Sequence, residues 1–327
     1  MKAIVSTQYG SPDVLSLQDV SKPELKKDDD VLIKVHASAI NPADWRMLRG
    51  KPFIGRLAFG LRKPSQPILG QDIAGVVEAV GVAVTSVQVG DRVFGELSAQ
   101  FGGGFAEYTS APEKFIAPMP ANCSFEQAAT VPLAGVTALQ GLRTHANVQA
   151  GEKVLINGAS GGVGTFAVQI AKALGAEVTG VCSTRNLDLV RSLGADHVID
   201  YTKTDFTQNG ERYDVILEVV GNRSVNDLKR CLAPDGRCIV VGFDNLSHLL
   251  QVVMDGLWAS WRSDQKFLQM PSAQANHEDL LFLKSLLEAE TITPVIDRTY
   301  ALAQVTEALH YLETGRARGK VVVKIAE

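Results

Sequence analysis

One segment, NGASGGVGTFAVQIAK at residues 157–172, restricts the possible folds of this chain more than any other. The residues at 153–157, KVLIN, have the apolar character of a buried strand. The apolar residues after the glycines recur at helical spacing, and Gly175 is suited to end the helix that they form: Val163, Phe166, Ala167, Ile170, Ala171 and Leu174. A strand that passes through a glycine-rich turn directly into a helix is typical of the first unit of a doubly wound α/β fold.

The glycine-rich turn itself has the composition of a phosphate-binding site. Its glycines lack a Cβ, so the backbone can turn tightly and come close to a pyrophosphate. The following helix offers unpaired N–H groups and the positive end of its dipole to that anion. The alternative is a glycine turn that is tight for structural reasons only. On the first interpretation, the sequence predicts cofactor contacts from Ser160, Gly161, Gly162, Val163 and Gly164.

The remaining pattern divides the 327 residues into two regions. The first 120 or so residues favour a compact β domain of partly open barrel type, because they contain short strands bounded by turns, at 31–38, 74–81 and 105–111. Strands then alternate with helices, the pattern of a Rossmann-type parallel sheet with helices on both faces. The further strands expected in that sheet are 177–182, 196–201, 213–220 and 237–243. Near the end, an amphipathic helix over 301–315 precedes a strand over 320–325.

The residues after the strand at 177–182 include Ser183 and Arg185 and no acid. An Asp or Glu there would accept hydrogen bonds from the adenosine ribose and repel a phosphate on the 2′ oxygen. A guanidinium beside a hydroxyl has the opposite preference, since it forms charge-assisted hydrogen bonds to a phosphate. Ser183 and Arg185 therefore predict NADPH as the cofactor. The alternative is that Arg185 is a solvated residue at the start of the next helix.

Composition and charge exclude several classes of protein. The net charge of −4 gives no electrostatic basis for binding nucleic acid or an anionic membrane. The first residues lack the apolar core of a signal peptide, and the most apolar stretch, 249–261, is interrupted by Asp255 and too short to span a bilayer. Four scattered cysteines without a Cys-x-x-Cys pair fit a reducing compartment. We therefore expect a cytoplasmic protein with no integral membrane segment.

Nine motifs together resemble one superfamily. They run from residue 9 to residue 323: YGSPDVLSL, AINPADW, ILGQDIAGVVEAVG, VGDRVFG, GGGFAEY, AATVPLAGVTALQGL, VLINGASGGVGTFAVQIAK, LGADHVIDY and GRARGKVVV. The chain is similar to zinc-independent medium-chain dehydrogenases/reductases, close to the quinone oxidoreductases and the NADPH-dependent enone or alkenal reductases. The resemblance implies a homodimer whose chains each have a GroES-like β domain, 1–123 and 296–327, and a Rossmann NADPH-binding domain, 124–295.

The expected zinc ligands of that superfamily are replaced. Zinc-dependent members carry a Cys and a His where this chain has Asn41 and Gln71, and a Cys or Asp in the segment that here contains Leu133. The four-cysteine lobe for structural zinc is also missing from 95–104. Neutral amides and a Leu cannot supply the deprotonated ligands of a zinc site. We therefore expect no catalytic metal.

The absence of zinc would limit the acceptor. Reduction of an ordinary ketone places charge on one oxygen, which zinc stabilises as a Lewis acid. A quinone or an α,β-unsaturated carbonyl delocalises that charge and needs less help from the protein. The leading hypothesis is hydride transfer from NADPH to such a small molecule. The alternatives are reduction of enoyl thioesters or other carbonyls, and a non-enzymatic NADPH-binding scaffold or sensor.

The resemblance also implies roles for individual residues. Asn41 would donate a hydrogen bond beside the nicotinamide or the substrate carbonyl, with Asp44 nearby; the alternative is an Asx turn before Pro42. The other residues with an implied cofactor contact have alternatives in plain packing or solvation: Thr137 and Val241 and Phe243 near the nicotinamide, Tyr201 near the adenine-side phosphate, and Lys320 over the cofactor.

Two regions stay open. Enoyl thioester reductases of the superfamily place a Tyr soon after the segment that matches NPAD, but residues 45–67 here contain none, so solvent is the expected proton source. The connection 46–67 could be a substrate lid or a surface loop. The apolar stretch Met254–Trp261 could form a dimer contact, a substrate wall or part of the core.

Overall fold

The computed structural model describes residues 1–242, 254, 256, 264–270 and 273–326. It divides into two compact units, and each is considered by itself. The first unit comprises Met1–Val136, Gln274–Glu290 and Pro294–Glu327; the second comprises Thr137–Ala273 and Thr291–Thr293. The first unit thus includes 124–136 and 274–290, whereas the boundaries expected from the sequence lie at residues 123 and 296.

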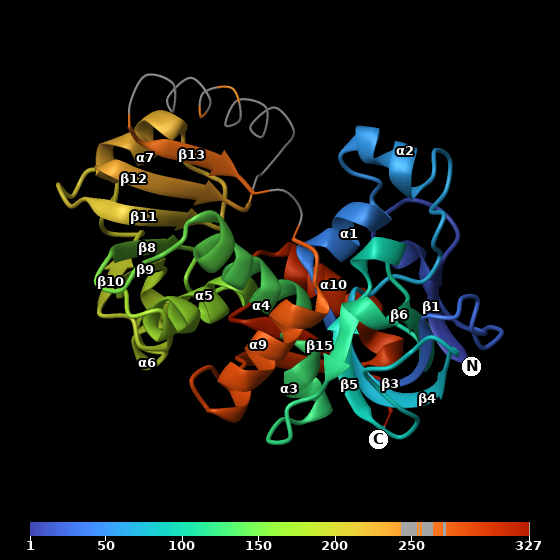
Figure 1. Cartoon of the computed structure of the whole chain (residues 1–327). Coiled ribbons are helices and arrows are strands. Elements are labelled where there is room, and N and C mark those ends of the chain that lie inside the picture. Colours follow the sequence, from blue (N-terminus) through green and yellow to red (C-terminus); the bar gives the residue numbers. More distant parts are fainter. Residues whose placement is uncertain (243–253, 255, 257–263, 271–272, 327) are drawn as a thin grey trace. The chain divides into compact units, whose positions relative to one another are not determined.

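The second unit is built on a parallel six-stranded sheet in the order β10-β9-β8-β11-β12-β13 (Figure 1). Every described pairing in it is parallel. The strands are β8 (Lys153–Asn157), β9 (Glu177–Cys182), β10 (His197–Asp200), β11 (Tyr213–Glu218), β12 (Leu232–Val240) and β13 (Lys266–Gln269). The chain moves outward from β8 through β9 to β10, then returns to the other side of β8 for β11. The strand order therefore reverses between β8 and β11, which is where α/β sheets of this kind bind ligands at the carboxyl ends of the strands.

Helices connect these strands. They are η5 (Gln140–His145, a π-helix), α5 (Gly162–Ala173), η6 (Thr184–Asn186), α6 (Leu187–Ser192) and α7 (Val225–Cys231). Helix α5 ends before Gly175, whose φ of 83° stops it as expected. Because β–helix–β crossovers are right-handed, and the chain leaves β8 and β11 in opposite directions along the sheet, α5 and α7 cover opposite faces. The strands between them read as nearly continuous buried apolar runs. The expected Rossmann-type sheet is confirmed.

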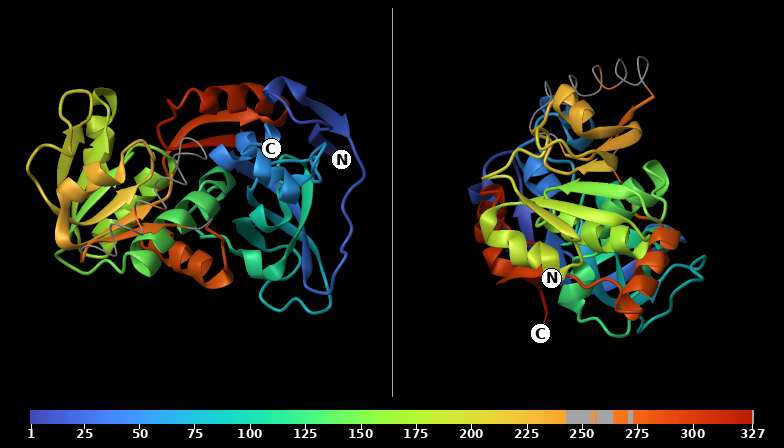
Figure 2. Two further views of the ribbon diagram at one scale, coloured as in Figure 1. Left: turned by 90° about the horizontal axis from the view of Figure 1, so that it is seen from above. Right: turned by 90° about the vertical axis from the view of Figure 1, so that its left-hand side faces the viewer.

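The first unit is a mostly antiparallel β domain. Its main sheet has the order β14-β15-β3-β4-β5-β7, with β6 also paired to β3, and β1 and β2 form a separate pair. The strands are β1 (Lys2–Ser6), β2 (Leu15–Asp19), β3 (Asp30–Ile40), β4 (Asp72–Val80), β5 (Arg92–Glu96), β6 (Tyr108–Pro112), β7 (Ile116–Pro118), β14 (Ile296–Ala301) and β15 (Lys320–Lys324). Strand β15, near the C-terminus, pairs with β3 near the N-terminus, and Figure 2 shows these red and blue segments side by side. Both ends of the chain therefore build this unit, as expected.

This unit also contains several helices and 3₁₀ turns. They are η1 (Pro12–Val14), α1 (Pro42–Leu48), η2 (Phe53–Gly55), α2 (Arg56–Phe59), η3 (Ser98–Gln100), η4 (Glu113–Phe115), α3 (Phe125–Ala129), α4 (Pro132–Leu139), α9 (His277–Glu288), η7 (Leu302–Gln304) and α10 (Val305–Glu313). The amphipathic helix α10 buries Val305, Ala308 and Leu309 against Val321 and Val323 of β15. This packing fixes the C-terminal strand on the domain.

Three of the expected elements differ from the structure by three residues or more at one end or both. The predicted strand at 105–111 begins only at Tyr108, and Ala106 forms an isolated bridge to Ala3. The predicted helix at 301–315 starts at Val305, after a 3₁₀ turn. The strand predicted at 237–243 begins earlier, at Leu232, and ends at Val240. Element ends depend on local capping, so they are the least reliable part of a sequence pattern.

Candidate functional site

A buried polar cluster in the first unit contains Asn41, Asp72 and Lys320. The exposed fraction of these residues is 3%, 0% and 3%. The Lys320 ammonium donates to Asp72 Oδ2 at 3.0 Å and to Asn41 Oδ1 at 2.5 Å. The Asn41 amide in turn donates from Nδ2 to Asp72 Oδ2 at 2.9 Å. Each polar group is paired, which is the condition for placing a lysine and an aspartate in a protein interior.

Strand register creates this cluster from three distant parts of the sequence. Val321 pairs with Ile40 between β15 and β3, which brings Lys320 beside Asn41 at the end of β3. Ala39 pairs with Asp72 between β3 and β4. The sequence implied a cofactor contact for Lys320 and a substrate contact for Asn41, and the structure brings these two residues together.

Asp44 lies directly behind Asn41, in the first turn of α1. Its carboxylate accepts hydrogen bonds from the backbone N–H of Asn41 at 2.7 Å and of Gly70 at 3.2 Å. Burial, with a smaller contribution from the nearby Asp72 carboxylate, raises the pKa of Asp44 from its usual 3.8 to about 7. Asn41 is the N-cap of α1, with Pro42 at the first helical position. Its backbone therefore serves the turn before Pro42, while its side chain belongs to the polar cluster.

Asp72, to which the sequence analysis assigned no role, lies at the centre of this cluster. Besides Lys320 and Asn41, it accepts a hydrogen bond from the backbone N–H of Leu133 at 2.8 Å. Gln71, its neighbour, points elsewhere, and its side-chain amide donates to Met47 Sδ at 3.1 Å. The one signal in the sequence was Lys320, which begins the apolar strand predicted at 320–325. A lysine buried there would need an acid as its partner. Among the described residues, no three His, Cys, Asp or Glu side chains are grouped as metal ligands.

The glycine-rich turn of the second unit joins β8 to α5. Gly158 has a φ of 89°, which favours glycine. A Cβ on Gly164 would lie 2.1 Å from the Gly158 carbonyl oxygen, so the helix can close on the turn only without one. A Cβ on Gly161, the N-cap of α5, would find its nearest neighbour, the same oxygen, at 3.5 Å. One glycine is therefore required by packing within the protein, whereas the other leaves space in front of the helix N-terminus. This cradle fits a pyrophosphate.

Asn186 links the turn to the end of β9, a contact that the sequence did not indicate. Its Nδ2 donates to Ser160 Oγ at 2.9 Å and lies 3.4 Å from Ser183 Oγ. The residue is 4% exposed, and its Oδ1 has no hydrogen-bond partner among the described residues. Because the amide occupies a lone pair of each hydroxyl, both serines can donate their protons to an anion. Arg185, one residue before Asn186, is exposed.

The neighbouring strand end supplies an acid that the sequence argument did not consider. Asp200, at the end of β10, accepts hydrogen bonds from Thr184 Oγ1 at 2.6 Å and Thr202 Oγ1 at 2.7 Å. The Lys203 ammonium lies 3.7 Å from the same carboxylate. Tyr201, a predicted cofactor residue, is 54% exposed, and its backbone N–H donates to the Cys182 carbonyl. The carboxylate of Asp200 is thus already occupied by hydroxyls and a cation.

Of the remaining predicted cofactor residues, Val241 lies beside the switch point and Thr137 lies in α4. Val241 follows β12 directly, and its N–H donates to the Glu218 carbonyl at 2.9 Å. Thr137 is 8% exposed in α4. Phe243 lies outside the described residues, as does most of Met254–Trp261. In the part of the chain that is described, no helix is both long and apolar enough to cross a bilayer.

Comparison with known proteins agrees with both units. Residues 27–121 match the alcohol dehydrogenase GroES-like domain family, and residues 193–323 match the family described as zinc-binding dehydrogenase. The chain is 37% identical to the 2-methylene-furan-3-one reductase of Solanum lycopersicum, over 99% of this chain and 79% of that protein. It is 36% identical to the chloroplastic NADPH-dependent alkenal/one oxidoreductase of Arabidopsis thaliana, with the same coverage of each chain.

A solved structure extends this likeness to the fold. The quinone oxidoreductase of Coxiella burnetii superimposes with a TM-score of 0.87 at 33% identity, over 99% of both chains. The two units, their motifs and these relatives lead to one assignment. The chain belongs to the medium-chain dehydrogenase/reductase family of oxidoreductases, in the group that contains the quinone oxidoreductases and the alkenal/one oxidoreductases.

Proposed function

We propose that this protein transfers a hydride from NADPH to a quinone or to the alkene of an α,β-unsaturated carbonyl compound. The observation that carries the proposal is the buried Asn41–Asp72–Lys320 cluster, which places the cationic donor Lys320 at the position where zinc-dependent relatives are expected to coordinate metal. Both amide hydrogens of Asn41 are used within the protein, by Ala39 and Asp72, and they hold its side chain in place. Relatives named as an alkenal/one oxidoreductase, a furanone reductase and a quinone oxidoreductase support the same class of acceptor.

The cofactor half of the proposal rests on the second unit. The Gly161 N-cap and the first turn of α5 would hold the pyrophosphate, and the hydroxyls of Ser160 and Ser183 would donate to phosphate oxygens. Arg185 would bind the 2′-phosphate, which selects NADPH over NADH. The nicotinamide supplies the hydride when the cofactor is bound. Tyr201, Thr137, Val241 and Phe243 stay predicted contacts.

The catalytic half rests on the first unit. Within the described part of the chain, two of the three N–H donors of Lys320 go to Asp72 and Asn41, which leaves the third for a ligand. A donor held in a buried ion pair is already oriented, so it can stabilise negative charge on a carbonyl or quinone oxygen without reorganisation. Asp44 fixes the backbone of Asn41 and so the direction of its amide. No tyrosine lies in 45–67, so solvent would protonate the released enolate or hydroquinone monoanion.

The test is a panel of acceptors offered with NADPH and with NADH. We expect loss of NADPH absorbance with small quinones, enals and enones, and little oxidation of simple secondary alcohols by NADP⁺. Turnover with enoyl thioesters alone would favour the alternative reductase. Tight NADPH binding with no turnover of any acceptor would favour a scaffold or sensor.

Three further features remain predictions. Elemental analysis of the purified protein should find no stoichiometric zinc, since Asn41, Gln71 and Leu133 occupy the expected ligand positions. Light scattering should find a homodimer. The cytoplasmic location follows from composition and cysteine usage, and fractionation of cells would test it.

A further inference from the structure

We infer that the buried Asn157–Glu218 pair is a positioning device that holds three strand ends together as the floor of the nucleotide site. The inference deepens the proposed function, because it assumes that the second unit binds a nicotinamide dinucleotide. Neither residue needs to touch the cofactor. Their effect on binding would pass through the backbone that they fix.

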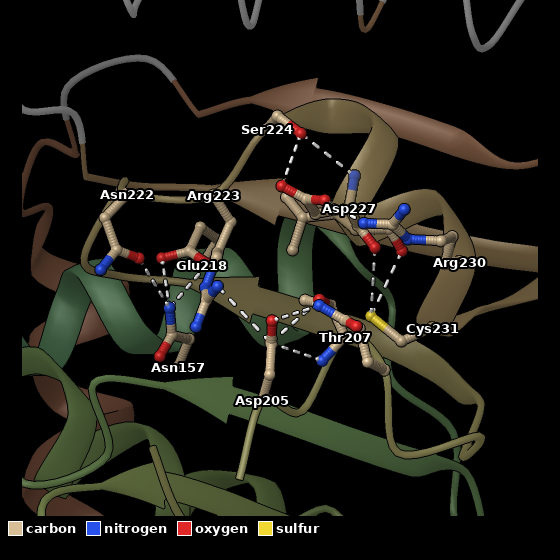
Figure 3. A network of polar contacts seen from close by, with 12 residues as sticks. Asn157, Asp205, Thr207, Glu218, Asn222, Arg223, Ser224, Asp227, Arg230 and Cys231 are labelled. Atoms are coloured by element: carbon tan, nitrogen blue, oxygen red, sulfur yellow. Dashed lines mark hydrogen bonds and ion pairs between the residues drawn. The ribbon is translucent and has the colours of Figure 1, made fainter. Parts of the chain in front are cut away.

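The pair lies at the switch point of the sheet. Asn157 is the last residue of β8 and Glu218 the last of β11, and the two are register partners in adjacent parallel strands. Asn157 Nδ2 donates to both carboxylate oxygens of Glu218, at 2.9 Å and 2.8 Å (Figure 3). Glu218 is 1% exposed, and burial raises its pKa. A buried acid at this position needs several donors to remain satisfied.

The other donors to Glu218 come from the loop that follows β11. The backbone N–H groups of Val220 and Gly221 donate to its Oε1 at 3.0 Å and 2.8 Å. Gly221 has a φ of 76°, so the loop turns sharply back over the carboxylate. One side chain therefore shapes the β11 loop and, through Asn157, ties it to the end of β8.

The backbone around the pair is tightly packed, so the three strand ends cannot move independently of one another. The Val219 N–H donates to the Asn157 carbonyl at 3.2 Å, and the Val241 N–H donates to the Glu218 carbonyl at 2.9 Å. A Cβ on Gly242 would lie 2.1 Å from the Val219 carbonyl oxygen. A Cβ on Gly158 would lie 2.8 Å from Val220 Cγ2. The ends of β8, β11 and β12 thus meet around this one side-chain pair.

The surrounding charges explain why an amide is present at residue 157. Arg223 reduces the pKa rise of Glu218 but is committed to Asp205, with Nη1 at 3.5 Å from that carboxylate (Figure 3). Its guanidinium also lies over the Phe206 ring, 5.1 Å from the centroid. An acid at 157 would place two buried carboxylates side by side, whereas an amide donates to the one that is there. The geometry is therefore specific for an amide facing a carboxylate.

Three variants test the inference by fluorescence titration of NADPH and NADH. Asn157→Leu removes the tie between the strands, and we expect affinity for both cofactors to fall by roughly tenfold with their ratio unchanged. Asn157→Asp should weaken both cofactors further, because the added carboxylate faces Glu218. Asn157→Asp with Glu218→Gln restores an amide facing a carboxylate, while the Gln oxygen still accepts from Val220 and Gly221. This double variant should recover most of the lost affinity.

Asn209→Asp is the matched control, since it makes the same change at an exposed position of the second unit and should bind as the parent does. Thermal unfolding without cofactor separates a general loss of stability from a change in the site. If the Asn157 variants unfold at lower temperature but bind both cofactors with unchanged affinity, the inference is wrong. It is also wrong if the double variant binds no better than Asn157→Asp alone. Failure of the proposed function would give a different result: NADPH would still bind and its affinity would still depend on Asn157, but no acceptor would be reduced.

Discussion

In the proposed cofactor site, the adjacent residues Arg185 and Asn186 would have different parts in binding a phosphate. Arg185 is exposed and would bring charge to the ligand, whereas Asn186 is buried and orients two serine hydroxyls. Asp200 lies nearby, but two threonines and Lys203 occupy its carboxylate. The positive charge that Arg185 adds at this strand end would favour an additional phosphate group on the cofactor.

We expect Arg185→Asp to weaken NADPH by roughly 10- to 150-fold, the value of a charge-assisted hydrogen bond of about 1.5–3 kcal/mol. NADH lacks the 2′-phosphate and should lose far less. Titration of both cofactors measures the ratio. Arg191→Asp is the control, because Arg191 is an exposed arginine in the same region that pairs with Asp188. An equal loss of NADPH and NADH in Arg185→Asp would remove the argument for the phosphate contact.

The raised pKa of Asp44 predicts how the stability of the protein depends on pH. Its pKa is 3.8 when the chain is unfolded and about 7 when it is folded, so the folded protein holds this proton more tightly. The stability that Asp44 contributes is therefore complete below pH 4 and is lost as the pH rises towards 7, with a slope of at most about 1.4 kcal/mol per pH unit. Relative to Asp44→Asn, the parent should lose free energy of unfolding between about pH 4 and pH 7, and the two curves should be parallel above pH 7. Parallel curves over the whole range, measured with urea, would show that Asp44 does not titrate there.

At the scale of elements, the turn before α5 separates glycines needed for packing from those that leave room for a ligand. Gly164→Ala would force a Cβ to 2.1 Å from the Gly158 carbonyl oxygen, so it should reduce both stability and cofactor binding. Gly161→Ala meets nothing closer than 3.5 Å and has an ordinary φ of −85°. It should unfold at nearly the parental temperature yet bind NADPH at least several-fold more weakly, since the new methyl occupies the space before the helix N-terminus.

Calorimetry and cofactor titration of the two glycine variants measure these effects side by side. The assignment of the phosphate cradle would be contradicted if Gly161→Ala kept full affinity. A Gly164→Ala variant as stable as the parent would also count against the assignment, because the predicted clash with the Gly158 carbonyl oxygen would then be absent.

At the scale of the whole chain, a buried ion pair joins two residues that lie far apart in the sequence. Lys320 in β15 neutralises Asp72 in β4, and both are buried. Lys320→Met would leave Asp72 without its cation, and loss of one partner of a buried pair costs about 3–5 kcal/mol. The double variant Asp72→Asn with Lys320→Met should regain much of that loss. Chemical denaturation of the parent and both variants measures the free energies, and a Lys320→Met protein as stable as the parent would show that the pair is not formed.

Much of the fold could be predicted from the sequence, because the spacing of hydrophobic residues indicates directly which residues are buried. The strand–glycine–helix order at 153–174, the alternation after it and the absent zinc ligands required no knowledge of distant contacts. The sequence could not place Asp72 at the centre of the polar cluster, since that depends on the register of β3 with both β4 and β15. It also missed Asn186 and the pairing of Asn157 with Glu218.

One physical cause separates the features that could be predicted from those that could not. Hydrophobic pattern and backbone freedom are local properties of the chain, so the sequence by itself determined the two kinds of unit and the glycine-rich turn. Buried polar groups find their partners only when strands align, and a shift of one residue would point each side chain to the opposite face of the sheet. The tertiary structure alone therefore decided which acid meets Lys320, which amide meets Glu218 and which hydroxyls Asn186 orients.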